Sequence, residues 1–351
     1  MKITWGCHVS PEEIKESCFL ILLTEYGGKL KGWGEKLLST GGKEILIKAV
    51  VQAVPSYAMS IFRLPKCLIG EIHRLSARFW WGSKDNQKKI HWCTWKRLCK
   101  PKFDGGLGFR DIELANRANL AKQCWRILMN PNSLAAKVLK GCYFREGSFM
   151  DAKCTGSGSF VWNSLMWGKG LLERGIRWRV GNGKSIKIYH DKWIPRPSTF
   201  KVFSPPKLNI EATVDQLIEP SGGWNVKLIR DNFHPEEAKD ILSIPISSNL
   251  REDTVLWHFE GNGLFSVKSG YWLGNNCETM PSNSSSSSSN SWWQFFWKLK
   301  IPLEVRILVW KACHDWIPTK VNIARRGIRT SNICDGCKIG NETTLKKLKI
   351  S

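Results

Sequence analysis

Long apolar runs and a secretory signal are both missing from this 351-residue chain. No apolar stretch approaches the roughly 20 residues that a membrane-spanning helix needs. The first residues also lack a basic segment followed by an apolar core, which is the pattern of a signal peptide. We therefore expect an intracellular protein, nuclear or cytoplasmic, that is neither secreted nor embedded in a membrane.

Catalytic patterns are missing as well. A polymerase palm needs paired carboxylates for two divalent metals, and no two Asp residues are adjacent. No Gly-x-Ser-x-Gly nucleophile motif occurs, and the neighbours Cys313 and His314 would diverge on a helix. No obvious set of Asp and Glu for a ribonuclease H site is visible either. The sequence predicts a protein that is not an enzyme, with a metal-dependent nuclease or polymerase-associated activity as the alternative.

Acidic side chains are scarce relative to basic ones. The chain has 53 Lys and Arg against 30 Asp and Glu, which gives a formal net charge of +23. Such an excess attracts polyanions, so RNA or DNA is the expected partner, bound largely without sequence preference. An anionic membrane surface is the lesser alternative. We expect no small-molecule substrate, and nothing in the sequence indicates an oligomeric state.

Tryptophan and cysteine, in contrast, are abundant. The 19 Trp recur along the chain, and most should be packed in the core. The 12 Cys are equally scattered, and most have apolar neighbours, as is typical of reduced, buried thiols. Buried packing is the default interpretation for Cys313, and a polar edge is the default for His314.

Helical periodicity dominates the chain. A pair of short helices is predicted within 224–242, and Gly105 to Gly108 is predicted to be a turn rather than a phosphate loop. Apolar residues recur at helical spacing in five further segments. These segments are 34–54, 69–81, 111–129, 292–298 and 303–314.

The middle of the chain has a different pattern. Two stretches, 177–188 and 257–267, alternate apolar and polar residues on both sides of a Gly-Asn-Gly turn, and each predicts a β-hairpin. Six consecutive Ser lie within 281–291, which predicts a flexible linker or loop tip. The expected fold class is therefore α+β and mainly helical.

Cations concentrate in two segments, 84–102 and the cluster of Arg325, Arg326 and Arg329 near the Cys334–Cys337 pair. Between residues 84 and 102 the chain carries seven Lys or Arg against Asp85 alone, with Trp92 and Trp95 among them. This composition favours a polyanion contact, although a solvated basic face is the alternative for any single residue. The candidate nucleic-acid-binding residues are Lys84, Lys88, Lys89, Lys96, Arg97, Lys100, Lys102, Arg325, Arg326 and Arg329.

Cys334 and Cys337 have the spacing of one half of a zinc site, and no Cys or His follows them. A structural zinc ion takes four ligands, usually as two close pairs. Cys313 and His314 are candidate extra ligands if the chain folds back onto the pair. Zinc is thus the candidate cofactor of an incomplete site, and no other cofactor is expected.

A series of motifs resembles one known family. The chain is similar to the region that follows the polymerase palm in plant LINE-type, non-LTR retrotransposon reverse transcriptases. The segment from about residue 257 resembles the reverse transcriptase zinc-binding domain, which in many members precedes a ribonuclease H-like domain. The motifs that carry the resemblance include Lys31-Gly32-Trp33-Gly34, Phe79-Trp80-Trp81-Gly82, Gly105-Gly106-Leu107-Gly108-Phe109, Trp178-Arg179-Val180-Gly181-Asn182-Gly183 and Phe265-Ser266-Val267-Lys268-Ser269-Gly270-Tyr271.

The resemblance implies a ligand set that this chain does not complete. In the family a His and a final Cys follow the Cys pair, whereas Lys346 stands here about where the His would be. We therefore expect a C-terminally truncated zinc-binding domain at 249–351, with a Ser-rich loop at 281–291. It would follow a helical thumb- or connector-like region at 1–150 and a hairpin and helical connector at 151–248.

These expectations combine into one functional hypothesis. The chain is interpreted as a catalytically silent fragment of a retrotransposon reverse transcriptase that binds RNA or DNA non-specifically. A translated pseudogene, or a structural or interaction protein without a nucleic-acid role, is the alternative.

Overall fold

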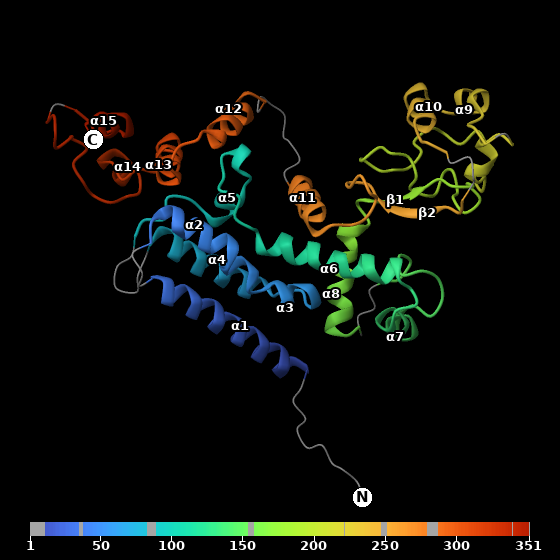
Figure 1. The fold of residues 1–351 in the computed structure, drawn as a ribbon, viewed down its shortest axis with the longest axis horizontal. Coiled ribbons are helices and arrows are strands. Elements are labelled where there is room, and N and C mark those ends of the chain that lie inside the picture. Colours follow the sequence, from blue (N-terminus) through green and yellow to red (C-terminus); the bar gives the residue numbers. More distant parts are fainter. Residues whose placement is uncertain are drawn as a thin grey trace, which may run out of the picture. The chain divides into compact units, whose positions relative to one another are not determined.

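The computed structural model describes residues 11–34, 38–82, 89–153, 158–220, 222–246, 251–278, 287–338 and 340–350 (Figure 1). Within these residues helices predominate, and two short strands form one antiparallel sheet. The predicted α+β, mainly helical class is therefore confirmed. No helix in these ranges combines the length and the apolar character needed to cross a membrane.

The chain divides into two compact units, each assembled from segments that are remote in sequence. Unit 1 comprises Met1–Ser56, Pro65–Glu113 and Pro281–Ser351, and unit 2 comprises Tyr57–Leu64 and Leu114–Met280. The predicted boundaries after residues 150 and 248 divide the chain along its length instead. The division into three sequence domains stays a prediction.

All the named elements of unit 1 are helices, and they are joined by loops. Its elements are α1 (Pro11–Gly34), α2 (Thr40–Ala49), the 3-10 helix η1 (Val51–Ala53), α4 (Lys66–Trp81), α5 (Trp95–Cys99), the 3-10 helix η2 (Lys102–Asp104), α12 (Ser287–Lys298), α13 (Leu303–Cys313), α14 (Lys320–Ala324) and α15 (Thr344–Ile350).

The helix α4 shows how local sequence sets these boundaries. Pro65 precedes its first turn, where a missing N–H costs nothing, and Gly82 ends it in the left-handed conformation (φ 72°) that glycine adopts without strain. Between these two residues, a buried stripe that includes Ile72 and Trp80 faces the interior.

Aromatic rings form the interior of unit 1 around the turn at 105–108. Trp95 stacks on Phe109 (centroids 4.9 Å apart), and Trp80 meets Phe109 edge-on. The fully buried Trp310 donates its Nε1–H to the Gly105 carbonyl (2.8 Å). A Cβ on Gly106 would lie 2.0 Å from the Lys100 carbonyl oxygen, so only glycine fits there. This segment is the predicted turn.

Unit 2 combines helices with the sheet. Its elements are α3 (Ser56–Ile61), α6 (Ile112–Met129), α7 (Leu134–Tyr143), α8 (Phe160–Leu172), β1 (Ile176–Arg179), the 3-10 helix η3 (Val214–Leu217), α9 (Val226–Asn232), α10 (Pro235–Leu242), β2 (Thr254–Trp257) and α11 (Val267–Glu278).

Unit 2 has two apolar cores. In the first core, Tyr143 stacks on the fully buried Trp162, with ring centroids 4.4 Å apart. The buried Trp257 and Phe265 belong to the same core. A Cβ on Gly168 would approach Leu120 Cβ to 2.7 Å, so this glycine allows α8 to pack tightly against α6. The second core surrounds the fully buried Trp193.

The two predicted hairpins do not form. Instead β1 pairs with β2, in a register that places Ile176 opposite Trp257. The first Gly-Asn-Gly turn is diverted because the Asp253 carboxylate accepts the backbone N–H groups of Gly181, Gly183 and Ser185. In the second stretch, Trp257 N–H donates to the Gly263 carbonyl (2.8 Å). This bond closes a short loop, so the residues on its two sides do not pair as strands of a hairpin. Long-range pairing therefore overrides the local hairpin pattern.

Most predicted helices are confirmed, with one change near the Ser-rich segment. The expected segments correspond to α2, α4, α6, α12, α13 and the pair α9 and α10. The linker expected at 281–291 is too long, because α12 already begins at Ser287. Residues 281–286 lie outside the described ranges.

Candidate nucleic-acid interface

The helix α5 displays the central part of the predicted basic stretch. Trp95 and Leu98 of α5 are buried, whereas Lys96 and Arg97 between them are exposed, and so is Lys100 just after the helix. The helical period therefore turns the apolar residues inward and the cations outward. Lys89 is also exposed, while Lys84 and Lys88 lie outside the described residues.

Arg97 is held over an aromatic ring. Its guanidinium lies 4.9 Å from the centroid of Trp316, and one of its nitrogens lies 3.2 Å from His314 Nδ1. A guanidinium over an indole face is attracted by the ring quadrupole and keeps its outer edge available to solvent. Arg97 is thus oriented by residues more than 200 positions away in sequence.

Arg326 repeats this arrangement from the second predicted cluster. It lies over the Trp92 ring (5.7 Å) and donates a hydrogen bond to the Trp92 carbonyl, inside the first cluster. Arg325 is exposed and lies 3.9 Å from the Asp315 carboxylate, and Arg329 is exposed. The contacts of Arg97 and Arg326 bring the two predicted clusters together in unit 1.

Lys102 has a different environment from the other candidates. Its Nζ lies 2.8 Å from the buried Glu44 carboxylate and 4.4 Å above the Trp297 ring. Burial alone would raise the pKa of Glu44, but the ammonium groups of Lys48 and Lys102 hold that pKa below its usual value. Lys102 therefore neutralises a buried charge and is less available to a ligand than Arg97.

Sequence reasoning missed two further cations of unit 1. Lys43 lies over Phe79 (5.7 Å) and Lys311 over Trp81 (5.9 Å). Burial and the nearby charge of Lys43 lower the pKa of Lys311. The Nζ atoms of Lys43 and Lys89 both lie within 4 Å of where a Cβ on Gly82 would stand. Lys43 and Lys311 are far from Trp81 in sequence, so no sequence pattern predicts that these cations meet near Trp81 in the folded chain.

The Cys334–Cys337 segment forms a compact knuckle. Cys334 is buried, its N–H donates to the Gly340 carbonyl (2.8 Å), and its own carbonyl accepts from Lys338 N–H (2.9 Å). An isolated bridge between Ile333 and Asn341 closes the loop. Backbone hydrogen bonds thus shape this knuckle.

Comparison with known proteins bears on this knuckle. Residues 265–348 match the family described as zinc-binding in reverse transcriptase. An uncharacterized mitochondrial protein of Arabidopsis thaliana is 43% identical over 40% of this chain and 93% of its own length. A second Arabidopsis thaliana protein, named "Putative ribonuclease H protein", is 30% identical over 97% of this chain.

The chain belongs to the plant family of retrotransposon-type reverse transcriptase proteins. It spans 55% of the length of the relative named for ribonuclease H. That relative therefore has a large region with no counterpart in the 351 residues of this chain.

Within the part of the chain that the structure describes, the knuckle has two thiols, Cys334 and Cys337, at ligand spacing. A structural site needs four N or S ligands. Among the described residues, no three His, Cys, Asp or Glu side chains are grouped so that they could hold one ion. Lys346, at the position that the resemblance assigns to a His, places its Nζ 3.5 Å from Cys337 Sγ. An ammonium carries no lone pair, so it cannot act as that ligand.

The candidate extra ligands are engaged elsewhere. His314 is sandwiched between Trp293 and Trp316, with centroids 5.1 and 4.5 Å away. Its Nε2 lies 3.0 Å from the Gly105 carbonyl oxygen, and its Nδ1 faces Arg97, so both ring nitrogens have partners. Cys313 is exposed, contrary to the expected buried packing. His314 is half-buried in an aromatic stack rather than at a polar edge.

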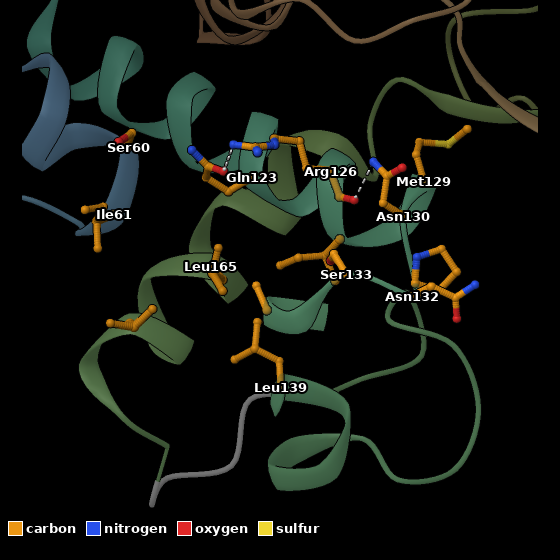
Figure 2. A pocket seen from close by; sticks show the side chains of 14 residues that line it. Ser60, Ile61, Gln123, Arg126, Met129, Asn130, Asn132, Ser133, Leu139 and Leu165 are labelled. Carbon is orange, nitrogen blue, oxygen red and sulfur yellow. Dashed lines mark hydrogen bonds between the residues drawn. The ribbon is translucent and has the colours of Figure 1, made fainter. Parts of the chain in front are cut away.

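Unit 2 contains a hollow lined by apolar side chains, uncharged polar side chains and Arg126 (Figure 2). Its volume is about 750 Å³, and residues of α3, α6, α7 and α8 contribute to its lining. Arg126 donates to the Gln123 side chain (3.3 Å) at its rim, while Leu139 and Leu165 are apolar. Among the described residues that line it there is no His, Cys, Asp or Glu.

Proposed function

We propose that this chain is a non-catalytic, nucleic-acid-binding part of a LINE-type retrotransposon reverse transcriptase. The expected ligand is RNA or DNA, bound through its phosphates and largely without sequence preference. No zinc ion is part of the proposal.

The observation that carries the proposal is the convergence of two basic clusters on tryptophan rings. Arg97 lies over Trp316 and Arg326 over Trp92, and both rings are at least nine-tenths buried. A cation held on a rigid ring loses little further freedom when it meets a phosphate. Exposed Lys89, Lys96 and Arg329 add charge to the same unit.

The distribution of carboxylates supports the non-catalytic part of the proposal. Described acids of unit 1 are mostly paired with cations, as Glu44 is with Lys48 and Lys102, and Asp104 with Lys100. Two-metal catalysis needs carboxylates that converge on the ions. No such group of three occurs in the described ranges.

Salt-titrated binding tests the proposal. Fluorescence anisotropy of the full chain with labelled RNA and DNA should show affinity that falls steeply with salt. Replacing Lys89, Lys96 and Arg329 by Glu should weaken binding at least about tenfold. The same changes should reduce the slope of log K against log salt by about one for each lost phosphate contact.

A matched variant in unit 2 separates a defined surface from bulk charge. Lys137, Lys140 and Lys239 are equally exposed, and their replacement by Glu changes the net charge by the same amount. We expect this variant to retain the wild-type slope. Equal losses in both variants, or a wild-type chain without affinity at low salt, would contradict the proposal.

A further inference from the structure

One face of α12 presents aromatic side chains to solvent. Trp292 is 45% exposed and Phe295 64% exposed, and Lys298 follows on the same side three residues later. Residues three apart are neighbours on a helix, so these three side chains form one stripe. Neighbouring exposed aromatic side chains that form one contiguous apolar patch are typical of interaction sites.

The opposite face of α12 anchors the helix. Phe296 is buried, Trp293 stacks on His314, and Trp297 lies under Lys102. The helix is therefore fixed within unit 1 by its inner residues. Of the outer stripe, Trp292 contacts two of these inner rings with one side of its ring, and Phe295 is largely exposed.

The Trp292 ring is already stacked on one side. It is nearly parallel to Phe296, with an interplanar angle of 4° and centroids 5.2 Å apart, and Trp293 meets it edge-on at 4.6 Å. A ring held in this way offers a fixed, flat surface to a further ring. Base stacking on such a surface loses little side-chain entropy.

Cations border the stripe. Lys298 and Lys300 are exposed, and Lys102 lies over Trp297 on the neighbouring flank. From Trp292 to Lys300 the chain contains no acidic residue. Among the described acids, Glu44 pairs with Lys102 (2.8 Å), Asp104 lies 3.8 Å from Lys100, and Glu304 is exposed. Lys102 is therefore neutralised, and Lys298 and Lys300 make the border positive, which suits a polyanion.

We propose that Trp292 and Phe295 form a stacking platform for unpaired bases, with Lys298 and Lys300 contacting the adjacent phosphates. The ligand is a single strand of RNA or DNA, because bases inside a duplex have no face available for stacking. The inference deepens the proposed function and rests on it. A second copy of this chain fits less well, because it would bring its own excess of positive charge against the same border.

The experiment uses the full chain and three labelled ligands: a single-stranded RNA, the same sequence as DNA, and the matching duplex. The double variant Trp292→Ala, Phe295→Ala should weaken single-strand binding about tenfold or more. Duplex affinity should change less than about twofold, and the salt slope should stay at its wild-type value because the phosphate contacts remain. The RNA and DNA arms distinguish the two sources of a single strand.

Two further variants keep the test specific. Trp292→Phe with Phe295→Tyr retains aromatic faces and should restore most of the affinity. Trp272 of unit 2 is 51% exposed, and its replacement by Ala should leave binding unchanged. Strands that carry 5-iodouracil should photo-crosslink to Trp292 or Phe295, as mapped by mass spectrometry.

Distinct outcomes overturn the inference and the proposed function. Suppose that the wild type binds polynucleotides. If the double variant then loses single-strand and duplex affinity equally, or loses no affinity at all, the platform is wrong and the proposed function stands. If the wild type binds none of the ligands, both are wrong. A double variant that sediments as a smaller species with unchanged affinity identifies the stripe as a contact between copies, which also overturns the platform.

Discussion

The two units differ in how their described charged side chains are used. In unit 2 buried and partly buried charges hold the backbone, as the buried Lys169 does by donating to the Ala152 carbonyl (2.7 Å). Glu237 is fully buried and accepts the N–H groups of Phe203 (2.8 Å) and Ser204 (3.1 Å), and Asp253 gathers three amides around the turn at 181–185. Cations lie on aromatic rings in both units, but among the described residues they are more numerous in unit 1, as Arg97 on Trp316, than in unit 2, where Arg63 and Arg117 lie over Trp167.

This difference shows what a large net charge means for a fold. An ionised group that is hydrogen-bonded to backbone amides has no free capacity for a ligand. A cation on a ring, in contrast, keeps hydrogen-bond donors directed toward solvent. The charge of +23 therefore does not describe a uniform surface. The proposal assigns polyanion binding to unit 1, and the following predictions test the contrast between the two units.

The largest expected effect is on the core that supports the basic surface of unit 1. Trp310 is fully buried and donates to the Gly105 carbonyl, so Trp310→Ala removes a large side chain and a hydrogen bond. We expect a loss of about 4 kcal/mol in the free energy of unfolding. Chemical denaturation measures this loss, and RNA affinity should fall with it.

The exposed Trp272 of unit 2 provides the control for this change. Trp272→Ala should cost less than about 1 kcal/mol, since an exposed ring buries little area. A Trp310→Ala variant with wild-type stability and wild-type RNA affinity would show that the positions of the basic side chains of unit 1 do not depend on its aromatic interior.

The second prediction concerns the carboxylate of unit 2. Glu237→Ala leaves the Phe203 and Ser204 amides without their acceptor in a buried site. Unsatisfied buried donors cost about 1–3 kcal/mol, so we expect a loss of that size in the free energy of unfolding. The adjacent Glu236, whose side chain is 84% exposed, gives the matched control, with a loss below about 0.5 kcal/mol.

Glu237→Ala also tests whether binding belongs to unit 1 alone. In partially denaturing conditions Glu237→Ala should affect hydrogen exchange of amides in unit 2 first. Polynucleotide binding by the folded variant should remain at the wild-type level. A large loss of RNA affinity in a folded Glu237→Ala variant would contradict the assignment of binding to unit 1.

Sequence patterns predicted the helices well because periodicity is a local property. Segments 69–81 and 111–129 became α4 and α6 within a few residues. The hairpins were wrong because Asp253 competes for the amides of the first turn and lies about 70 residues away. No local pattern encodes that competition.

The candidate interface was predictable in its parts but not in its assembly. Composition alone indicated both basic clusters. Their convergence depends on the contact of Arg326 with Trp92, which joins positions 234 apart. The environment of His314 was missed for the same reason, since Trp293, Trp316 and Gly105 meet it only in the folded chain. The pattern of exposed Trp292 and Phe295 became visible only when the inner face of α12 was known.

The third prediction concerns acid sensitivity and uses one partly buried histidine from each unit; burial also lowers the pKa of His91 and His314 in unit 1. His73 accepts the Ile112 N–H in unit 1 (3.3 Å), and His258 accepts the Arg177 Nε–H in unit 2 (3.2 Å). Burial lowers the pKa of both rings. The charge of Arg177 lowers the pKa of His258 further, whereas Asp111 partly offsets the effect for His73.

The sign of the pH dependence follows from these shifts. Below about pH 6.5 the unfolded chain takes up protons that the folded rings still reject, so stability falls as the pH is lowered. The melting temperature should drop between pH 7.5 and pH 5.5. His258→Gln should reduce this drop, and a change at the exposed His190 should not. An undiminished drop in a double variant at His73 and His258 would assign the acid sensitivity to other groups, among them His91 and His314, whose pKa values are also lowered by burial.

The smallest expected effect is at the knuckle, where a cation of unit 1 meets a thiol rather than a ring. Lys346→Met removes the contact with Cys337 Sγ, and the backbone hydrogen bonds of Cys334 remain. We expect a change below about 1 kcal/mol and no change in melting temperature when a chelator is added. Lys346→His makes the opposite test, because it supplies a third nitrogen or sulfur ligand beside the two thiols. That variant should bind cobalt(II) with a thiolate charge-transfer band that is weaker or absent in the wild type. A wild-type chain that loses several degrees of melting temperature in the chelator would show that ligands beyond the described residues complete a zinc site.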